Sequence, residues 1–269
     1  MKPSNRTGIM GRIVARVLLA LGYVFIWAPV IVLVLFSFSR NKFGLWWEGF
    51  TLQWYAELLT NAKVGQALQT SLIVAAVAVV VSTALGTLAA YGLYKYRFRG
   101  KKAVRIGLLL PIVMPPVVIG AALLAFFSKV IRIPLGYPSI LIAHISFSVP
   151  LATFVILGRM ARIDWSLEEA SADLGADTLT TWRKIIVPLL LPGIIASAAL
   201  IFPWSFDDVT VTFFVAGTGT MTLPLYIFSR IRAGPSPIIN AIGMIFVALP
   251  TIGLVLWTML QSRVSGKKR

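Results

Sequence analysis

Long apolar segments alternate with short polar connections along almost the whole of this chain. Six of the apolar runs are long enough to cross a bilayer, which takes about 20 residues in a helix. They cover roughly residues 13–37, 67–94, 104–127, 139–160, 185–206 and 238–262. Because lipid offers no hydrogen-bond partners, the backbone of each run must satisfy itself, and we expect six transmembrane helices. The pattern predicts an all-α integral membrane protein with one domain over residues 1–269.

Composition supports the same class. The 269 residues are 58% hydrophobic and 13% charged, whereas soluble domains are about 25% charged. A soluble globule of this length could not bury so much apolar surface. The first apolar run, Val17 to Phe38, is too long for a cleaved signal sequence, so we expect a retained first helix.

The distribution of Lys and Arg predicts the orientation. Six helices put both termini on one side, together with the loops 95–105 and 159–184. Eighteen of the 25 Lys and Arg residues fall on that side and seven on the other. The positive-inside rule then places both termini in the cytoplasm. We attribute the net charge of +16 to topology and to contact with anionic lipid rather than to nucleic acid.

Three features interrupt the simple span pattern. Pro115-Pro116 lies inside the third run and indicates either a helix break that lines a pathway or a structural kink. The segment 207–237 is apolar but rich in turn residues, so we expect it to fold back into the protein, with a short helix near 221–232. His144 is the only histidine, and one histidine makes no metal cluster, so we expect a hydrogen-bonded structural position.

An acidic passage lies between the fourth and fifth runs. It holds five of the nine acidic residues, namely Asp164, Glu168, Glu169, Asp173 and Asp177. Ser166 and Glu169 have the spacing of a capping box, and Gly175 is placed to end the helix. Asp177 or Thr178 can begin a second short helix that runs toward Ile185. These signals leave two interpretations open, a solvated linker or a docking site for a partner.

The spacing of this passage resembles the signature of ABC-importer permeases, E-A-A-x3-G-x9-I-x-L-P. The departures are Ser171, where the family usually has Ala, and Val187, where it usually has Leu. In that family the passage is a coupling helix that docks in a cleft of a separate ATPase subunit. The resemblance implies a coupling helix over about 166–176 and assigns ATPase coupling to Glu168, Glu169, Ala170, Ser171, Gly175, Ile185 and Pro188.

Further blocks resemble the second permease of bacterial spermidine/putrescine importers. They are Asn41-Lys42-Phe43-Gly44 with Trp47 to Thr51, Arg97 to Lys101, Phe206 to Val209, and Ile231 to Ala241. The resemblance implies a type I importer with a binding protein outside, a second permease, and two ATPase copies inside. No phosphate-binding loop G-x-x-x-x-G-K-[ST] occurs, so we expect ATP hydrolysis in the partner and no catalytic residue, cofactor or metal in this chain.

Asp207 and Asp208 are the candidate substrate residues. They follow the fifth run, and charges at that depth usually face a cavity or a partner. A polyamine needs carboxylates to replace its hydration and aromatic faces for cation–π contact, which adds Trp204, Phe206 and Tyr226 to the predicted pathway. Simple solvation of a helix end by the two acids remains the alternative.

Other functions are considered for the same chain. A permease of this architecture could carry thiamine, ferric iron or an amino-phosphonate. A proton- or sodium-coupled secondary carrier would need ionisable residues within the spans, where His144 stands almost alone. A scaffold would not need the interrupted third run. Binding of a nucleotide-hydrolysing partner separates the importers from the last two.

Overall fold

The computed structural model describes residues 5–42, 46–234 and 236–266, so Phe43 and Gly44 of the resembling block, Pro235 and the outermost Lys residues lie outside it. The described residues form helices and connections, with one isolated antiparallel bridge between Ser39 and Phe50. The chain divides into two units, residues 1–62 with 229–269 and residues 63–228, and each is described by itself.

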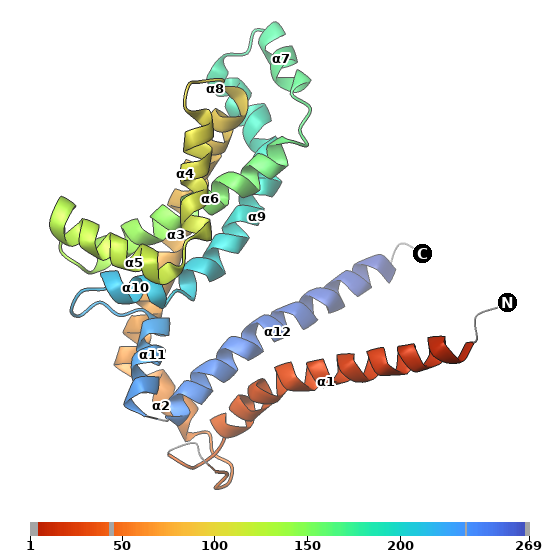
Figure 1. Ribbon diagram of the computed structural model, residues 1–269, viewed down its shortest axis with the longest axis vertical. Coiled ribbons are helices and arrows are strands. Elements are labelled where there is room, and N and C mark those ends of the chain that lie inside the picture. Colours follow the sequence, from red (N-terminus) through yellow and green to blue (C-terminus); the bar gives the residue numbers. More distant parts are fainter. Residues whose placement is uncertain (1–4, 43–45, 235, 267–269) are drawn as a thin grey trace. The chain divides into compact units, whose positions relative to one another are not determined.

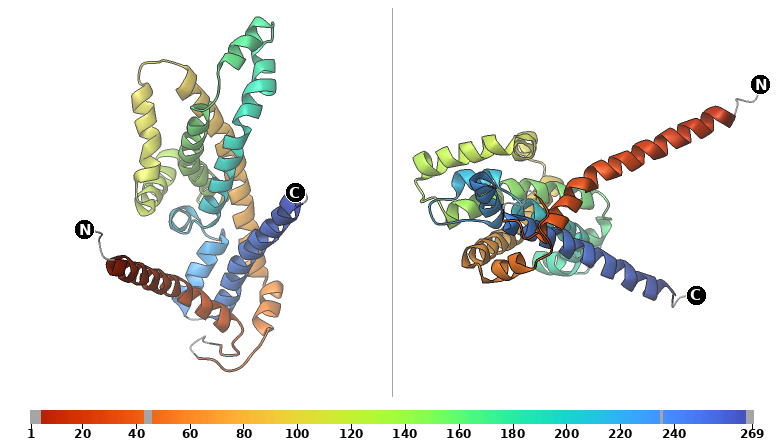
Figure 2. Two further views of the ribbon diagram at one scale, coloured as in Figure 1. Left: turned by 90° about the vertical axis from the view of Figure 1, so that its right-hand side faces the viewer. Right: turned by 90° about the horizontal axis from the view of Figure 1, so that it is seen from below.

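The first unit is built on two long helices. Helix α1 (Asn5–Ser37) packs against α12 (Pro237–Gly266), which also contacts α2 (Gln53–Thr60) (Figures 1 and 2). Gly243 allows this approach, because a Cβ there would lie 2.8 Å from Leu33. The connection to α2 is tied down by the buried indole of Trp54, which donates to the Ser39 carbonyl at 2.7 Å. Most apolar side chains of α1 are exposed, as expected for a lipid-facing helix.

The second unit contains most of the remaining helices. They are α3 (Ala62–Lys95), α4 (Lys101–Val113), α5 (Pro116–Ala125) with the π-helical turn η1 (Phe126–Ile131), α6 (Tyr137–Met160), α7 (Ser166–Asp173), α8 (Thr178–Thr181) with the π-helical turn η2 (Trp182–Ile186), α9 (Val187–Phe206) and α10 (Thr210–Val215). Helix α11 (Leu223–Ala233) begins in this unit. Helices α6 and α9 pack together along their length, and two apolar clusters, around Phe127 and around Ile156, form the core.

The six predicted apolar segments are helical apart from Met114 and Pro115 in the third. Within the described residues, five helical stretches are long and apolar enough to span a membrane, namely Gly11–Ser37, Ala62–Lys95, Tyr137–Met160, Thr178–Phe206 and Pro237–Met259. The third predicted segment is different, because α4 and the stretch Pro116–Ile131 meet at 109° (Figure 1). Of the two interpretations of Pro115-Pro116, the structure therefore has a sharp break rather than a slight kink.

The break has a local cause. A residue before proline is pushed out of the α region, and here two such residues follow each other. Met114 (ψ 139°) and Pro115 (ψ 135°) are both extended, while Pro116 begins α5, where its missing N–H costs no hydrogen bond. Two extended residues in succession redirect the chain, so α5 leaves the line of α4 and packs against α10 (Figure 2).

The segment after the fifth span folds back, as predicted. Val211, Thr212 and Val215 of α10 are buried, and so are the first residues of α11. The hydroxyl of Ser71 in α3 accepts from the Leu223 amide at 2.8 Å and so attaches the start of α11. The predicted helix at 221–232 corresponds to α11.

Candidate coupling and substrate sites

The acidic passage forms two short helices, α7 and α8, separated by a tight turn. Gly175 has φ +79°, a conformation that favours glycine. Its amide donates to the Ala172 carbonyl at 2.9 Å, and the Ala176 amide donates to the Ser171 carbonyl at 3.1 Å. These two bonds make a Schellman motif, so Gly175 ends α7 as the sequence predicts.

The predicted capping box at Ser166 and Glu169 is wrong. Helix α7 begins one residue too early for it, so Ser166 is the first helical residue, and its N-cap residue, Trp165, makes no side-chain capping bond. The carboxylate of Asp164 instead accepts from the Ser166 amide at 3.0 Å. Hydrogen bonding from Ser166 lowers the pKa of Asp164.

Asp177 caps α8, as predicted. Its carboxylate accepts from the Thr180 amide at 3.2 Å. Hydrogen bonds from the Thr180 side chain and backbone hold the pKa of Asp177 below its ordinary value, and the nearby Lys184 adds a smaller effect in the same direction. The cap is therefore formed by a carboxylate that is ionised at neutral pH.

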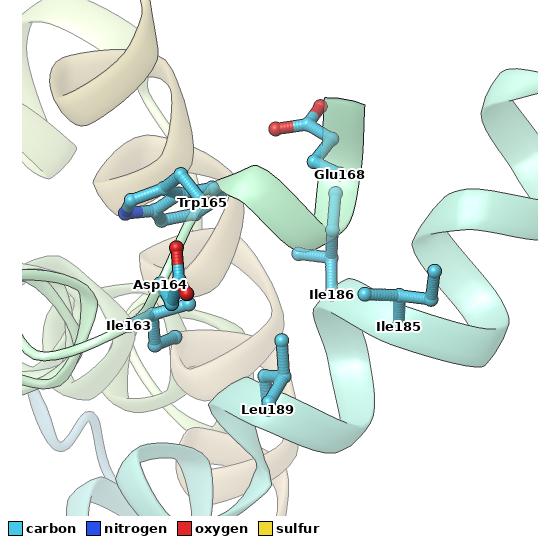
Figure 3. A pocket seen from close by; sticks show the side chains of 7 residues that line it. All are labelled: Ile163, Asp164, Trp165, Glu168, Ile185, Ile186 and Leu189. Atoms are coloured by element: carbon cyan, nitrogen blue, oxygen red, sulfur yellow. The ribbon is translucent and has the colours of Figure 1, made fainter. Parts of the chain in front are cut away.

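The seven predicted coupling residues differ in exposure. Glu169, Ala170, Gly175 and Pro188 are exposed, Ile185 and Glu168 are half-buried, and Ser171 is buried. The hydroxyl of Ser171 lies 2.9 Å from that of Thr181 and ties α7 to α8. The usual Ala of the family could not make this bond. Figure 3 shows Glu168 and Trp165 beside a small cavity and Ile185, Ile186 and Leu189 on the helix across it.

Glu168 faces inward onto α3. Its carboxylate accepts from the Tyr91 hydroxyl at 3.0 Å and forms an ion pair with Lys95. The ring of Trp165 stacks on Tyr94, with 5.0 Å between ring centroids. Sequence analysis missed Tyr91, Tyr94 and Lys95, which it treated as part of a span and as a topology charge. Their spacing places these three side chains close together on the last turns of the helix, which could have indicated a contact there. The sequence did not indicate which residues they would contact.

The outward side of the passage carries exposed apolar side chains. Leu174 is 89% exposed and Leu179 74% exposed, and Leu167 is nearly half exposed. The exposed Glu169 carboxylate of α7 has no hydrogen bond or ion pair within the described residues. Apolar side chains held out on a rigid, capped turn are typical of a docking surface.

The predicted substrate acids lie beside a groove at the break in the third span. The groove encloses about 550 Å³ and is lined by Pro111, Ile112, Met114, Pro116, Ile119, Phe147, Leu200, Pro203, Trp204, Asp207, Asp208 and Val211. The end of α4 contributes a partial negative charge and the start of α5 a partial positive one. The partial charges of these two helix ends have opposite signs and offset each other. The carboxylates of Asp207 and Asp208 therefore set the sign of the charge at this surface.

The two acids have different surroundings. Asp208 is half-buried, and its carboxylate accepts from the amides of Val211 at 3.2 Å and Thr212 at 2.8 Å, and from the Thr212 hydroxyl at 2.9 Å. It therefore holds the start of α10. Asp207 is exposed, and its carboxylate makes no hydrogen bond or ion pair within the described part of the chain. Asp207 is thus the carboxylate that can receive a cation.

His144 belongs to the same polar network and is fully buried. The Thr212 hydroxyl gives its proton to Asp208, so Thr212 accepts from His144 Nε2–H at 2.9 Å. His144 Nδ1 lies 2.7 Å from the Ser205 hydroxyl, and either of these two atoms can be the donor. The predicted hydrogen-bonded position of His144 is confirmed, and it connects α6, α9 and α10.

The remaining predicted pathway residues are divided. Trp204 lines the groove with Asp207 and Asp208, and it is 56% exposed. Phe206 stacks on Phe202 and is not among the lining residues, while Tyr226 is buried in α11. The structure thus brings three of the five predicted residues to one groove.

The model of the family described as "Binding-protein-dependent transport system inner membrane component" matches residues 82–266. The chain belongs to this family. Membership separates this inner membrane component from the secondary-carrier and scaffold alternatives. The matched residues 82–266 include the acidic passage, the groove and both acids.

Named relatives of this inner membrane component span nearly its whole length. It is 40% identical to the spermidine/putrescine transport system permease protein PotC of Haemophilus influenzae, over 90% of this chain and 93% of the relative. It is 37% identical to PotC of Escherichia coli K12, over 92% of this chain and 93% of that protein. It is 36% identical to the putrescine transport system permease protein PotI of the same strain, over 91% and 89%.

Solved structures share the fold of this inner membrane component. One is a bacterial ABC transporter involved in the import of the acidic polysaccharide alginate, with a TM-score of 0.70 and 16% identity over 97% of this chain and 99% of that one. Another is the MetNI methionine ABC transporter, with a TM-score of 0.57 and 14% identity over 80% of this chain and 97% of that one. The predicted all-α permease fold of type I ABC importers is confirmed.

Proposed function

We propose that this chain is one permease subunit of an ATP-driven importer for polyamines such as spermidine and putrescine. It would form the pathway with a second permease, receive its cargo from an external binding protein, and couple through residues 166–176 to two copies of an ATPase. Its termini would lie in the cytoplasm. No ATP hydrolysis, cofactor or metal is assigned to this chain.

The observation that carries the cargo assignment is the Asp207 carboxylate, unpaired within the described residues, at a groove shared with Trp204. A carboxylate replaces the hydration of an ammonium group, and an indole face attracts a cation. The groove also offers long apolar walls to the methylene chain of a polyamine. Relatives named for polyamine transport support the same cargo. The half-buried Asp208 would position α10 rather than hold the cargo.

The exposed residues of the passage support the coupling role. Leu174 and Leu179 offer apolar contacts, and Glu169 offers a carboxylate with no partner in the described chain. A separate subunit that docks here from the cytoplasm could push on α7. Rigid displacement of this kind switches transporters between outward and inward access.

Uptake of labelled spermidine and putrescine by the native bacterium tests the proposal. We compare a deletion strain with strains that carry back the wild type, Asp207→Asn, Asp208→Asn or the control Glu57→Gln, a change at an exposed acid in α2. Loss of one close charge interaction, of about 1–2 kcal/mol, predicts that Asp207→Asn lowers uptake at subsaturating polyamine about tenfold at unchanged membrane abundance.

Asp208→Asn should act differently. It weakens charged hydrogen bonds to α10, so we expect a loss of about 1–3 kcal/mol in stability and a lower abundance in the membrane. If deletion leaves polyamine uptake intact, the polyamine assignment fails, and thiamine, ferric iron and amino-phosphonates are tested next. If Asp207→Asn and Glu57→Gln behave alike, the carboxylate at the groove has no part in transport.

A further inference from the structure

The coupling passage is joined to the membrane part of its unit by more than its two chain connections. Glu168 of α7 is bound to two residues one helical turn apart near the end of α3, Tyr91 and Lys95. The Tyr91 side chain is 8% exposed and that of Glu168 is 19% exposed. The Lys95 side chain is 40% exposed, so its ion pair with Glu168 is partly open to solvent and to screening by salt, and the Tyr91–Glu168 hydrogen bond is the more sheltered part of the joint.

Aromatic rings reinforce the same joint. Trp165, directly before α7, stacks on Tyr94 of α3 at an interplanar angle of 27°, and its indole donates to the Met160 carbonyl at 3.2 Å. The ring of Tyr91 meets Trp182 of η2 edge-on, with centroids 4.6 Å apart. The last turns of α3 therefore hold α7 and η2 as well, and the end of α6 is attached through Trp165.

The adjacent Glu169 has no such partner. It projects from the helix about 100° away from Glu168 and lines the same open cavity as Lys95 and Glu168, but it is exposed and makes no hydrogen bond or ion pair within the described residues. The two successive carboxylates thus differ in their contacts. Glu168 is used inside the chain, which modifies its predicted assignment to the ATPase contact, and Glu169 remains available to a partner.

We propose that Tyr91, Lys95 and Glu168 form a clamp through which α7 and α3 move as one body when a partner displaces the passage. This rests on the proposed coupling function. The clamp residues are positioning residues. Without the clamp, a push on α7 would be taken up by the short connections at 161–165 and 174–177. With it, the push reaches the length of α3, whose Ser71 hydroxyl holds the start of α11.

The test uses the assembled transporter in proteoliposomes, with cargo uptake and ATP hydrolysis measured on the same vesicles. The variants are Lys95→Glu, Glu168→Lys and the double exchange, with Lys102→Glu as a control for a charge change in the same loop. Lys102 is exposed and lies in the first turn of α4 rather than at the end of α3. Each single exchange should leave hydrolysis within about twofold and lower the cargo moved per ATP about tenfold.

Rescue separates coupling from simple folding. The double exchange restores opposite charges, so it should recover at least about half of the wild-type ratio of cargo to ATP, while Lys102→Glu stays at the wild-type ratio. The clamp proposal is overturned if the single exchanges keep the wild-type ratio of cargo to ATP. It is also overturned if the double-exchange protein assembles normally but its ratio stays as low as in the single exchanges.

A second readout does not depend on the cargo. The chain contains no cysteine, so spin labels can be placed at Asp173→Cys in α7 and at the exposed Leu88→Cys in α3. The distance between the labels should be the same without nucleotide and with ATP, and should spread in Glu168→Lys. A distance that changes with ATP in the otherwise wild-type chain contradicts the clamp. If the wild type moves no polyamine, the cargo assignment fails, but these distances still test the clamp.

Discussion

At the scale of single residues, glycine and small side chains decide which helices of the unit 63–228 can approach each other closely. Gly86 of α3 lies against α6, where an added Cβ would collide with Ala152 and lie 3.0 Å from the Thr153 amide nitrogen. Gly193 of α9 packs on Arg159 in a similar way, with 2.8 Å to its Cβ. Close packing of small residues is a main source of helix association in lipid. These positions therefore carry stability, whereas Asp207 and Glu169 are left open for function.

Gly86→Ala tests this packing, with Gly92→Ala as its control in the same helix. A Cβ at Gly92 meets nothing within 4 Å. We expect overpacking to cost Gly86→Ala about 1–3 kcal/mol, seen as a lower thermal unfolding midpoint in detergent. Gly92→Ala should keep or raise that midpoint, because alanine is favoured over glycine in helices. Equal midpoints for the two variants would contradict the packing argument.

At the scale of elements, the break between α4 and α5 and the turn between α7 and α8 position two different candidate sites. The break follows from two residues that each precede a proline, and it opens the groove at Asp207. The turn follows from Gly175 in a left-handed conformation and from the Asp177 cap. Both are local backbone events, and each positions a site that no single helix could form.

The Asp177 cap has a defined pH dependence. Its folded-state pKa is depressed, so its contribution is complete above the ordinary Asp value and is lost as pH falls through the folded-state value. At neutral pH we expect Asp177→Ala to speed hydrogen exchange at the Thr180 amide. Asp177→Asn, which keeps a capping oxygen, should have a smaller effect. Unchanged exchange in Asp177→Ala would show that the cap does not hold α8.

At the scale of the whole molecule, the chain is a multi-pass protein whose charges are distributed unevenly. Basic residues concentrate in the segments 95–105 and 159–184 and near both ends. Translocated loops carry fewer of them, because membrane insertion retains Lys and Arg on the cytoplasmic side. This topology stays a prediction, as does a single domain over residues 1–269.

Cysteine labelling in intact cells tests the orientation. Single cysteines are introduced at Leu59, which is 88% exposed in α2, and at the exposed Asp173. A membrane-impermeant maleimide should label Leu59→Cys directly and Asp173→Cys only after the membrane is opened. Labelling of Asp173→Cys from outside would reverse the proposed topology and remove the coupling role of α7.

The sequence by itself determined the class and the number of apolar segments, and it predicted the acidic passage and the acid pair as sites. The class and the segments follow from segment length against bilayer thickness, and the turn between α7 and α8 follows from Gly175 and Asp177 as helix signals, whereas the spacing from Glu169 to Pro188 carried a family resemblance. They need no knowledge of which helices are neighbours. The missing capping box at Ser166 shows the limit, since one residue of shift in a helix start removes it.

Only the tertiary structure decided what each acid does. Glu168 and Glu169 are adjacent in sequence and chemically equal, yet Glu168 is bound by residues of α3 more than seventy positions away. Asp207 and Asp208 are equally alike, yet Asp208 holds α10 and joins the His144 network, and Asp207 faces the groove. A side chain's role depends on which distant groups surround it, and that is set by the packing of helices rather than by local pattern.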